Sequence, residues 1–172
     1  MATCAEKIAE WLHEKGITHA FGVVGGGNIA IWDAITRAKK THLVCVHHEQ
    51  AAAMAAAYYY RASGRLALCL VTTGGGSSNA ITGVLAAFMD RTPLIVISGN
   101  EASKYMGVPT RVLGVQGYPN AHVARSFTKD AIQPNAAFSV LDCLQHAYDV
   151  ALAAPQGSVW VDICKDYQSA RL

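Results

Sequence analysis

The feature that most constrains the fold is a regular alternation of strand-like and helical segments along the whole chain. Short apolar runs rich in β-branched residues are typical of buried strands, and patterns with a period near 3.6 residues are typical of helices. The strand-like runs cover residues 18–24, 41–46, 65–73, 93–99, 125–132 and 158–164. The helical patterns cover residues 3–16, 28–39, 77–90 and 135–153, and an alanine-rich stretch that follows Glu49. This order predicts an α/β fold of three layers, with a central six-stranded, mostly parallel sheet and helices on both faces.

The bulk composition limits the partners that the chain can have. No repeat, linker or low-complexity segment interrupts the 172 residues, so residues 1–172 are expected to form one domain. Only 15% of the residues are charged, compared with about a quarter in ordinary domains, which predicts that other subunits cover much of the surface. The net charge of +2 and the lack of a Lys/Arg cluster argue against a nucleic-acid partner.

The cysteines and the N-terminus indicate the compartment. The five cysteines are scattered without a CxxC pair, so neither a zinc site nor a disulfide framework is expected. The first residues alternate charged and apolar side chains like an amphipathic helix, not like a signal peptide. No apolar run reaches the roughly 18 residues of a membrane span. We therefore expect a cytoplasmic location and no membrane association.

Three polar or glycine-rich motifs fall where predicted strands end. In parallel sheets, ligands gather at the carboxyl ends of the strands. Glycine triplets follow the first and third strands, at residues 25–27 and 74–76, and His47-His48-Glu49 follows the second. Residues 100–124 lack a clear period, and a loop of that length in a compact domain is usually functional. The sequence therefore predicts a ligand site at this edge.

The first triplet has two interpretations. Gly25 begins a G-x-G-x-x-A pattern between a strand and a helix, and Glu49 lies 24 residues later at the end of the next strand. A dinucleotide site needs glycines beside the pyrophosphate and an acid for the ribose hydroxyls. A tight strand-to-helix turn would need the same glycines without any ligand. The residues alone leave both open.

The second triplet is equally ambiguous. It lies in Thr-Thr-Gly-Gly-Gly-Ser-Ser-Asn, residues 72–79, before a predicted helix. Bare backbone amides at a helix start favour an anion or a polar ligand edge. The stretch lacks the Gly-Lys-Ser/Thr of a triphosphate-binding loop. A ligand loop and a capped turn are equally good interpretations.

Glu49 is the most unusual residue of the three motifs. An acid in the first turn of a helix commonly just interacts with the helix dipole. The helix that follows contains AAAMAAA, which is apolar on every face and implies that its start is buried. A buried carboxylate is costly unless something pairs with it, which predicts a ligand. His47 and His48 have no third metal ligand at suitable spacing, so no metal site is expected; we expect one of them to be packed and the other at the surface.

Taken together, the motifs resemble the pyrimidine-binding domain of thiamine-diphosphate enzymes of the acetolactate synthase and pyruvate oxidase group. Four segments match family patterns in order and cover nearly the whole chain. They are FGVVGGGNIAIWDAI, VHHEQAAAMAAAYYYRASG, VTTGGGSSNAITGVLAAFMDRTPLIVISGN and GSVWVDICKDYQ.

The resemblance implies roles for individual residues. The family glutamate that matches Glu49 hydrogen-bonds a ring nitrogen of the cofactor's aminopyrimidine and favours the imino tautomer, whose nitrogen removes the thiazolium proton. His48 matches a histidine that could shuttle protons, so Glu49 and His48 are the expected catalytic residues. The expected cofactor-binding residues are Glu49, Gly74, Gly75, Asn79, Gly25 and Gly26. Gln116 and His47 are expected on the substrate side.

Some positions depart from the family pattern. Val24 and Gly75 stand where the family has proline, His47 replaces an arginine, and Gly117 replaces the glutamate that follows the family glutamine. These differences leave the 2-oxo acid substrate and the exact reaction open. The family reaction decarboxylates such an acid and then protonates or ligates the resulting acyl-anion equivalent.

The largest departure concerns the metal. Family enzymes hold the cofactor's diphosphate through Mg²⁺ bound by a G-D-G…N motif, and no GDG occurs in these 172 residues. The resemblance therefore implies a split enzyme, a heterotetramer or larger, whose partner subunit carries G-D-G…N and the Mg²⁺. Two alternatives are a stand-alone NAD- or FAD-binding module using Gly25, Gly27 and Glu49, and a non-catalytic regulatory subunit.

Overall fold

The computed structural model describes residues 1–106 and 111–172. Its central sheet has six strands in the order β2-β1-β3-β4-β6-β5, and every neighbouring pair is parallel. The strands are β1 (His19–Gly22), β2 (His42–Cys45), β3 (Leu68–Val71), β4 (Leu94–Asn100), β5 (Asp130–Ile132) and β6 (Ser158–Cys164). The predicted fold class is confirmed, and each strand lies inside the predicted run or one residue beyond it.

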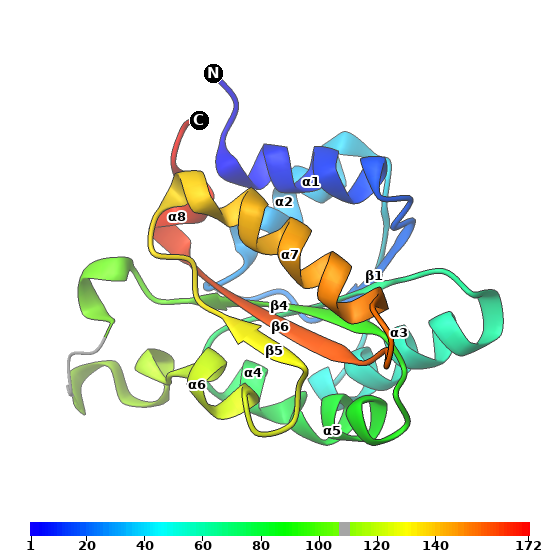
Figure 1. Ribbon diagram of the computed structural model, residues 1–172. Helices are drawn as coiled ribbons and strands as arrows, with labels where there is room; N and C mark the ends of the chain where they lie inside the picture. Colours follow the sequence, from blue (N-terminus) through cyan, green and yellow to red (C-terminus); the bar gives the residue numbers. More distant parts are fainter. Residues whose placement is uncertain (107–110) are drawn as a thin grey trace.

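Helices cover both faces of this sheet (Figure 1). One face carries α1 (Cys4–Glu14), α2 (Ile29–Ala38), α7 (Val140–Leu152) and α8 (Lys165–Ser169). The other carries α3 (Glu49–Ser63), α4 (Gly75–Asn79), α5 (Ile81–Met89) and α6 (Asn120–Ala124). Short 3-10 helices cover Ser103–Tyr105, Arg111–Gly117 and Ala137–Ser139.

Two hydrophobic clusters hold the three layers together. Successive strand residues point to opposite faces, so each strand contributes to both clusters. In β4, for example, Ile95 and Ile97 pack in the cluster with α1, α2 and α7, whereas Leu94 and Val96 pack with α3 and α5. All seven residues of β4 and of β6 are buried, as expected for central strands of a parallel sheet covered on both faces.

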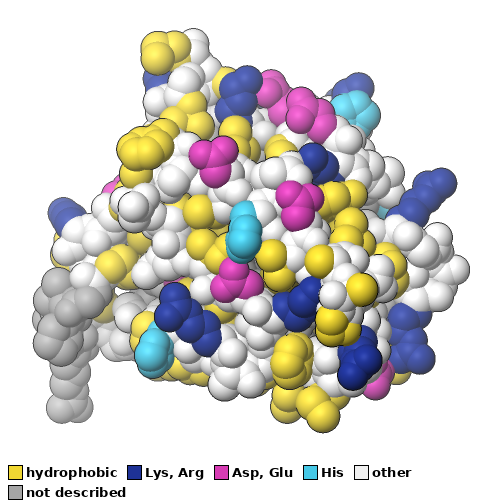
Figure 2. All heavy atoms as spheres, viewed as in Figure 1, with side chains coloured by type: hydrophobic (Ala, Val, Ile, Leu, Met, Phe, Trp, Pro, Cys, Tyr) yellow, Lys and Arg dark blue, Asp and Glu magenta, His cyan; other side chains and the backbone are white. Residues whose placement is uncertain are grey.

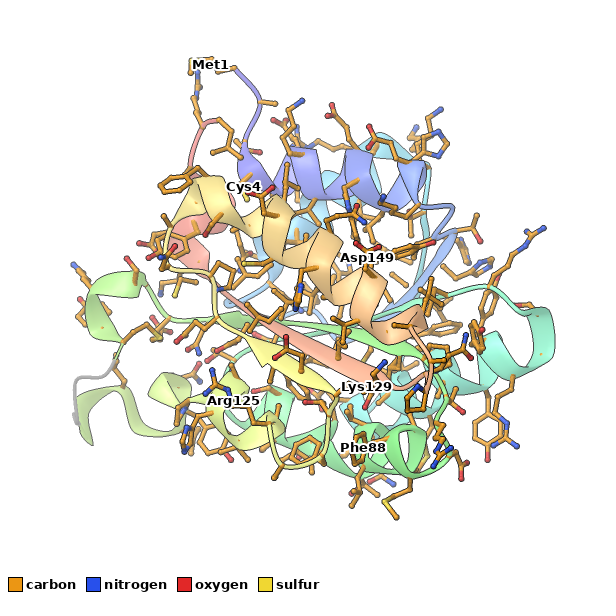
Figure 3. The ribbon with its side chains drawn as sticks, viewed as in Figure 1. Met1, Cys4, Phe88, Arg125, Lys129 and Asp149 are labelled. Carbon is orange, nitrogen blue, oxygen red and sulfur yellow. The ribbon has the colours of Figure 1, made fainter. Side chains whose placement is uncertain are left out.

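The helix ends follow local sequence chemistry. Thr3 and Glu6 form the predicted capping box of α1, with Thr3 Oγ1 accepting from the Glu6 N–H at 3.2 Å. Lys129, labelled in Figure 3, lies beside the carboxyl end of α7 and its Nζ donates to the Ala153 carbonyl at 2.7 Å. A cation there satisfies helix carbonyls that have no partner within the helix.

Several predicted helices differ in detail. The helix expected over residues 77–90 is two helices, α4 and α5, which meet at Ala80, and α4 already begins at Gly75. The helix expected over residues 135–153 consists of a 3-10 turn at Ala137–Ser139 followed by α7. The short helix α8 was not expected.

The strand order defines where a ligand would bind. The chain leaves β1 through α2 on one face to reach β2, and then returns through α3 on the opposite face to β3. The helices that follow β1 and β3 thus lie on opposite faces, and in parallel sheets ligands bind at the carboxyl ends of the strands at such a switch point. The two glycine triplets follow these strands.

Two surface properties bear on partners. On the face shown in Figure 2, Lys/Arg and Asp/Glu side chains are scattered among hydrophobic ones and form no separate basic patch. Within residues 1–106 and 111–172, no helix is both long and apolar enough to cross a membrane.

Candidate functional site

Glu49 lies at the start of α3, beside the glycine loop that follows β3. His48 is the N-cap residue of α3, and its Nδ1 accepts from the Gln50 N–H at 3.2 Å. The helix behind Glu49 buries Ala52, Ala53, Ala56 and Ala57. Only 8% of Glu49 is exposed, so the predicted burial of this helix start is confirmed.

The two carboxylate oxygens of Glu49 have different surroundings. Asn79, the last residue of α4, donates from Nδ2 to Glu49 Oε2 at 3.0 Å. Glu49 Oε1 receives no hydrogen bond from the residues that the structure describes. Gly76 lies against it, because a Cβ at this position would be 3.1 Å from Oε1. The site therefore presents an acceptor oxygen beside bare backbone.

Cys69 lies beneath this carboxylate in β3. Burial raises the pKa of its thiol, and the negative charge of Glu49 adds to the effect. The thiol is therefore protonated at neutral pH, and Cys69 is not a nucleophile at this site.

Thr72 joins the two glycine loops. Its Oγ1 accepts from the Gly27 N–H at 3.0 Å. A Cβ at Gly25 would lie 2.5 Å from Thr72 Oγ1, and a Cβ at Gly76 would lie 2.4 Å from Thr72 Cγ2. The glycines on either side of Thr72 are thus required for packing against one side chain.

This packing bears on the dinucleotide interpretation. Asn28 closes the first loop as a turn, since its Oδ1 accepts from the Gly25 N–H at 2.8 Å and its Nδ2 donates to the Val23 carbonyl at 3.0 Å. Gly25 and Gly27 are therefore needed for the packing against Thr72 and for the turn that they form. The G-x-G-x-x-A pattern is explained without a pyrophosphate, so it no longer supports a dinucleotide site.

The segment that contains Gln116 lies on the second glycine loop. Gly74 has a φ of 62°, and a Cβ there would lie 2.3 Å from the Val115 carbonyl oxygen. Thr73 Oγ1 donates to the Gln116 carbonyl at 2.5 Å. The Gln116 side chain is exposed. Residues of the long loop are thereby held next to the helix that carries Asn79.

The structure brings some predicted residues together and leaves others apart. Glu49, Asn79, Gly74 and Gln116 belong to one connected region, and Gly25 joins it through Thr72. His47 and His48 are both exposed, so the expectation that one of them is packed was wrong. Among the described residues, no group of three or more His, Cys, Asp or Glu side chains could hold a metal ion.

Sequence reasoning missed three residues. Thr72 and Gly76 lie within residues 72–79, and the sequence indicates no separate role for either of them. Asp162 lies in β6 and is completely buried. Burial raises the pKa of its carboxyl to about 6, although hydrogen bonds from Asn120, Ser98 and Asn100 lower it. The available signal was an acid inside the apolar run Val-Trp-Val-Asp-Ile-Cys.

The larger cavities lie elsewhere. Two of them, of about 420 and 410 Å³, are at the amino edge of the sheet, where Thr18 lines both. Glu49 lines neither of these cavities and lies at the carboxyl edge of the sheet. Exposed apolar side chains lie on the loops and the helix start beside it: Val24, Ile29 and Val115 are 44%, 58% and 67% exposed.

Known proteins with similar sequences share this part of the chain. The family described as thiamine pyrophosphate enzyme, N-terminal TPP binding domain, matches residues 2–124. The acetolactate synthase large subunit of Haemophilus influenzae is 34% identical over 162 residues, which are 94% of this chain and 28% of that protein. The isozyme 3 large subunit of Escherichia coli acetolactate synthase is 33% identical over 166 residues, 96% of this chain and 28% of that protein. The chloroplastic acetolactate synthase of Arabidopsis thaliana is 31% identical over 167 residues, 95% and 24% respectively.

The chain thus spans between 24% and 28% of the length of these three relatives. The match runs through both glycine loops and Glu49, and it agrees with the resemblance that the motifs indicated. The chain belongs to the family of N-terminal TPP-binding domains of thiamine pyrophosphate enzymes.

Proposed function

We propose that this chain is the pyrimidine-binding subunit of a thiamine-diphosphate enzyme that decarboxylates a 2-oxo acid and then protonates or ligates the product. The observation that carries the proposal is the position of Glu49. Its carboxylate is buried at a helix start, one oxygen is held by Asn79, and the other lies beside the bare backbone of Gly76.

The residues present fit the aminopyrimidine ring. Glu49 Oε1 has no donor among the described residues, so a ligand N–H at this oxygen would complete the site. A protonated ring nitrogen supplies such a donor, and a hydrogen bond to a charged acceptor is worth about 1.5–3 kcal/mol. Gly76 keeps a side chain away from this oxygen, since a Cβ there would lie 3.1 Å from Oε1.

The chemistry divides between cofactor and protein. Thiamine diphosphate, when bound, supplies the electron sink that makes loss of carbon dioxide feasible. Glu49 holds and releases a proton at Oε1, and Asn79 keeps the carboxylate from rotating by holding Oε2. His48 uses Nδ1 to cap α3, so Nε2 is the nitrogen that it can turn toward a substrate. Gln116 and His47 stand as substrate-side residues because both side chains are exposed at the same edge.

We also propose that a partner subunit completes the site in a heterotetramer or larger assembly. The partner would carry G-D-G…N and hold Mg²⁺ through oxygen ligands. One surface observation supports this arrangement. The helices α3 and α5 expose Tyr58 and Met89 by 62% and 71%. Exposed apolar surface of this kind is typical of subunit interfaces.

The direct experiment is to purify the chain from its native source under mild conditions, identify its partners by mass spectrometry and assay bound thiamine diphosphate. We expect a stoichiometric partner with G-D-G…N, together with the cofactor and magnesium. A homo-oligomer that lacks thiamine diphosphate, and above all one that holds a dinucleotide, would refute the proposal.

A substitution then tests the proton relay. We expect Glu49→Gln to abolish turnover while the assembly stays intact, because an amide cannot exchange the proton. Glu14→Gln, at the exposed carboxyl end of α1, is the matched control and should retain full activity. A fully active Glu49→Gln enzyme would exclude the relay.

A further inference from the structure

A buried carboxylate that the proposed mechanism does not use lies in β6, two strands from β3 in the sheet. This residue is Asp162, and β6 lies between β4 and the edge strand β5 (Figure 1). Asp162, Ser98 and Asn100 have no exposed surface, and Asn120 is also buried. No Lys or Arg of the described residues forms an ion pair with Asp162.

Every polar group around Asp162 donates to it. Ser98 Oγ and Asn120 Nδ2 donate to Oδ1 at 2.6 and 3.0 Å. Asn100 Nδ2 donates to Oδ2 at 2.5 Å, and Gln133 Nε2 lies 3.4 Å from the same oxygen. An ionised carboxylate can only accept. The amides of Asn100 and Asn120 must therefore turn their NH₂ groups toward Asp162 and their oxygens away from it.

The oxygen of Asn120 leads to the Glu49 site. It accepts from Ser77 Oγ at 2.6 Å, and Ser77 is the central residue of α4. The last residue of α4 is Asn79, which donates to Glu49. A short path of hydrogen bonds, with one residue of α4 between Ser77 and Asn79, thus connects Asp162 with the carboxylate at the start of α3.

The Asn100 amide contacts the Gln116 segment through its NH₂ group. Its oxygen accepts from the Glu101 N–H at 2.8 Å and lies 3.4 Å from Thr73 Oγ1. Thr73 has a single hydroxyl hydrogen, and its shorter bond of 2.5 Å goes to the Gln116 carbonyl. Asn100 Nδ2 also donates to the Tyr118 carbonyl at 3.2 Å. The Asn100 amide therefore binds the carbonyl of Tyr118, two residues after Gln116.

We propose that Asp162 is a positioning residue: by setting the orientation of the Asn100 and Asn120 amides, it places α4 with Asn79 against Glu49 and holds the Gln116 segment on the second glycine loop. This positioning of α4 and of the Gln116 segment concerns residues of this chain alone. That it also prepares the site for thiamine diphosphate rests on the proposed function.

Asp162→Asn tests the orientation directly. The asparagine side chain has the same size as aspartate but replaces one oxygen by an NH₂ group. This NH₂ group then faces at least one neighbouring side chain that also donates. One neighbouring amide must then turn over or lose its bond. We expect backbone hydrogen exchange, followed by mass spectrometry on the full chain in its native assembly, to become about tenfold faster at residues 73–79 and 111–117. Exchange in the remainder of β4 and β6 should change little.

A charge swap provides the rescue. In Asp162→Asn/Asn120→Asp, the amide at position 162 donates to a carboxylate at position 120, which still accepts from Ser77. We expect the double variant to return exchange at residues 73–79 toward the wild-type rate. Asp149→Asn, on the exposed side of α7 (labelled in Figure 3), is the matched control and should leave both segments unchanged.

The outcomes distinguish this proposal from the proposed function. Unchanged exchange at residues 73–79 in Asp162→Asn, or a double variant no better than the single one, overturns the positioning role. If Asp162→Asn does not fold, Ser77→Ala removes the link to α4 without altering β6, and unchanged exchange in α4 then overturns the role. Loss and rescue of exchange protection in a protein that never binds thiamine diphosphate would uphold the positioning role and reject the proposed function.

Discussion

Two neighbouring glycines in α4 provide a matched test of how the site is packed. A Cβ at Gly76 would lie 2.4 Å from Thr72 Cγ2 and 3.1 Å from Glu49 Oε1, whereas a Cβ at Gly75 would meet nothing within 4 Å. Carbon atoms in contact are normally about 3.5–4.0 Å apart. Gly76→Ala therefore forces an overlap of roughly 1 Å or more, and Gly75→Ala does not.

Thr72 has little freedom to relieve this overlap. Its χ1 is restricted by β-branching, its Oγ1 is bonded to the Gly27 N–H, and Gly25 packs against its other side. Overpacking of this kind costs about 1–3 kcal/mol. Loss of the Thr72–Gly27 hydrogen bond would add about 0.5–1.5 kcal/mol. The better helix propensity of alanine returns about 0.5–1 kcal/mol.

The net prediction is a destabilisation of about 1–3 kcal/mol for Gly76→Ala, and a neutral or slightly stabilising effect for Gly75→Ala. For a chain of this length, each kcal/mol changes the melting temperature by about 2–4 °C. Calorimetry of the two variants in the same assembly state measures the difference. If Gly76→Ala is as stable as Gly75→Ala, the close packing of Thr72 against the second glycine loop is wrong.

Three further predictions concern the same edge of the sheet. Gly75→Pro should raise the free energy of unfolding by about 0.4–1 kcal/mol, because proline suits the first position of a helix; a lower melting temperature would contradict this. Gly99→Ala should destabilise the chain by at least about 1–3 kcal/mol in urea titrations, since its Cβ would lie 1.8 Å from the Gly27 carbonyl oxygen, while Gly26→Ala should have no such effect. The pKa of Asp162 is about 6 in the folded chain and 3.8 in the unfolded chain, so its carboxyl group stabilises the fold fully below pH 3.8, and this stabilisation is lost as the pH rises through 6. The shift corresponds to about 3 kcal/mol of unfolding free energy. Asp162→Asn should remove this pH dependence, and parallel curves of unfolding free energy against pH for the two proteins would refute the prediction.

The sheet and most helices could be predicted because their signals are local. The capping box at Thr3 and Glu6, the buried runs of β4 and β6, and the alanine pattern of α3 each lie within one element. The break at Ala80 carries no proline or glycine signal, and the glycines at the start of α4 indicate a loop. Here the tertiary packing against Thr72 overrides the local propensity.

The site was predictable only in part, for a different reason. The bond between Asn79 and Glu49 joins residues 30 positions apart, and the contacts of Asp162 join residues 29 to 64 positions apart. The periodicity of a sequence does not show contacts between residues so far apart in the chain. The resemblance to a family indicated Glu49 and Asn79 because it carries spatial information. It assigned no role to Asp162, whose only local sign is an acid inside an apolar strand.

The two glycine triplets show what the sequence left undecided. In each of them the outer glycines face protein atoms: Gly25 and Gly27 lie against Thr72 and Thr73, and Gly74 and Gly76 lie against Val115 and Thr72. The middle glycines, Gly26 and Gly75, have nothing within 4 Å of a Cβ. Four of the six glycines are therefore explained by the fold, and two are not. Alanine at these middle positions does not disturb the packing of this chain, so Gly26→Ala and Gly75→Ala should keep the wild-type stability. If they keep it but lose cofactor binding or subunit assembly, the added methyl group must collide with the cofactor or with a partner subunit.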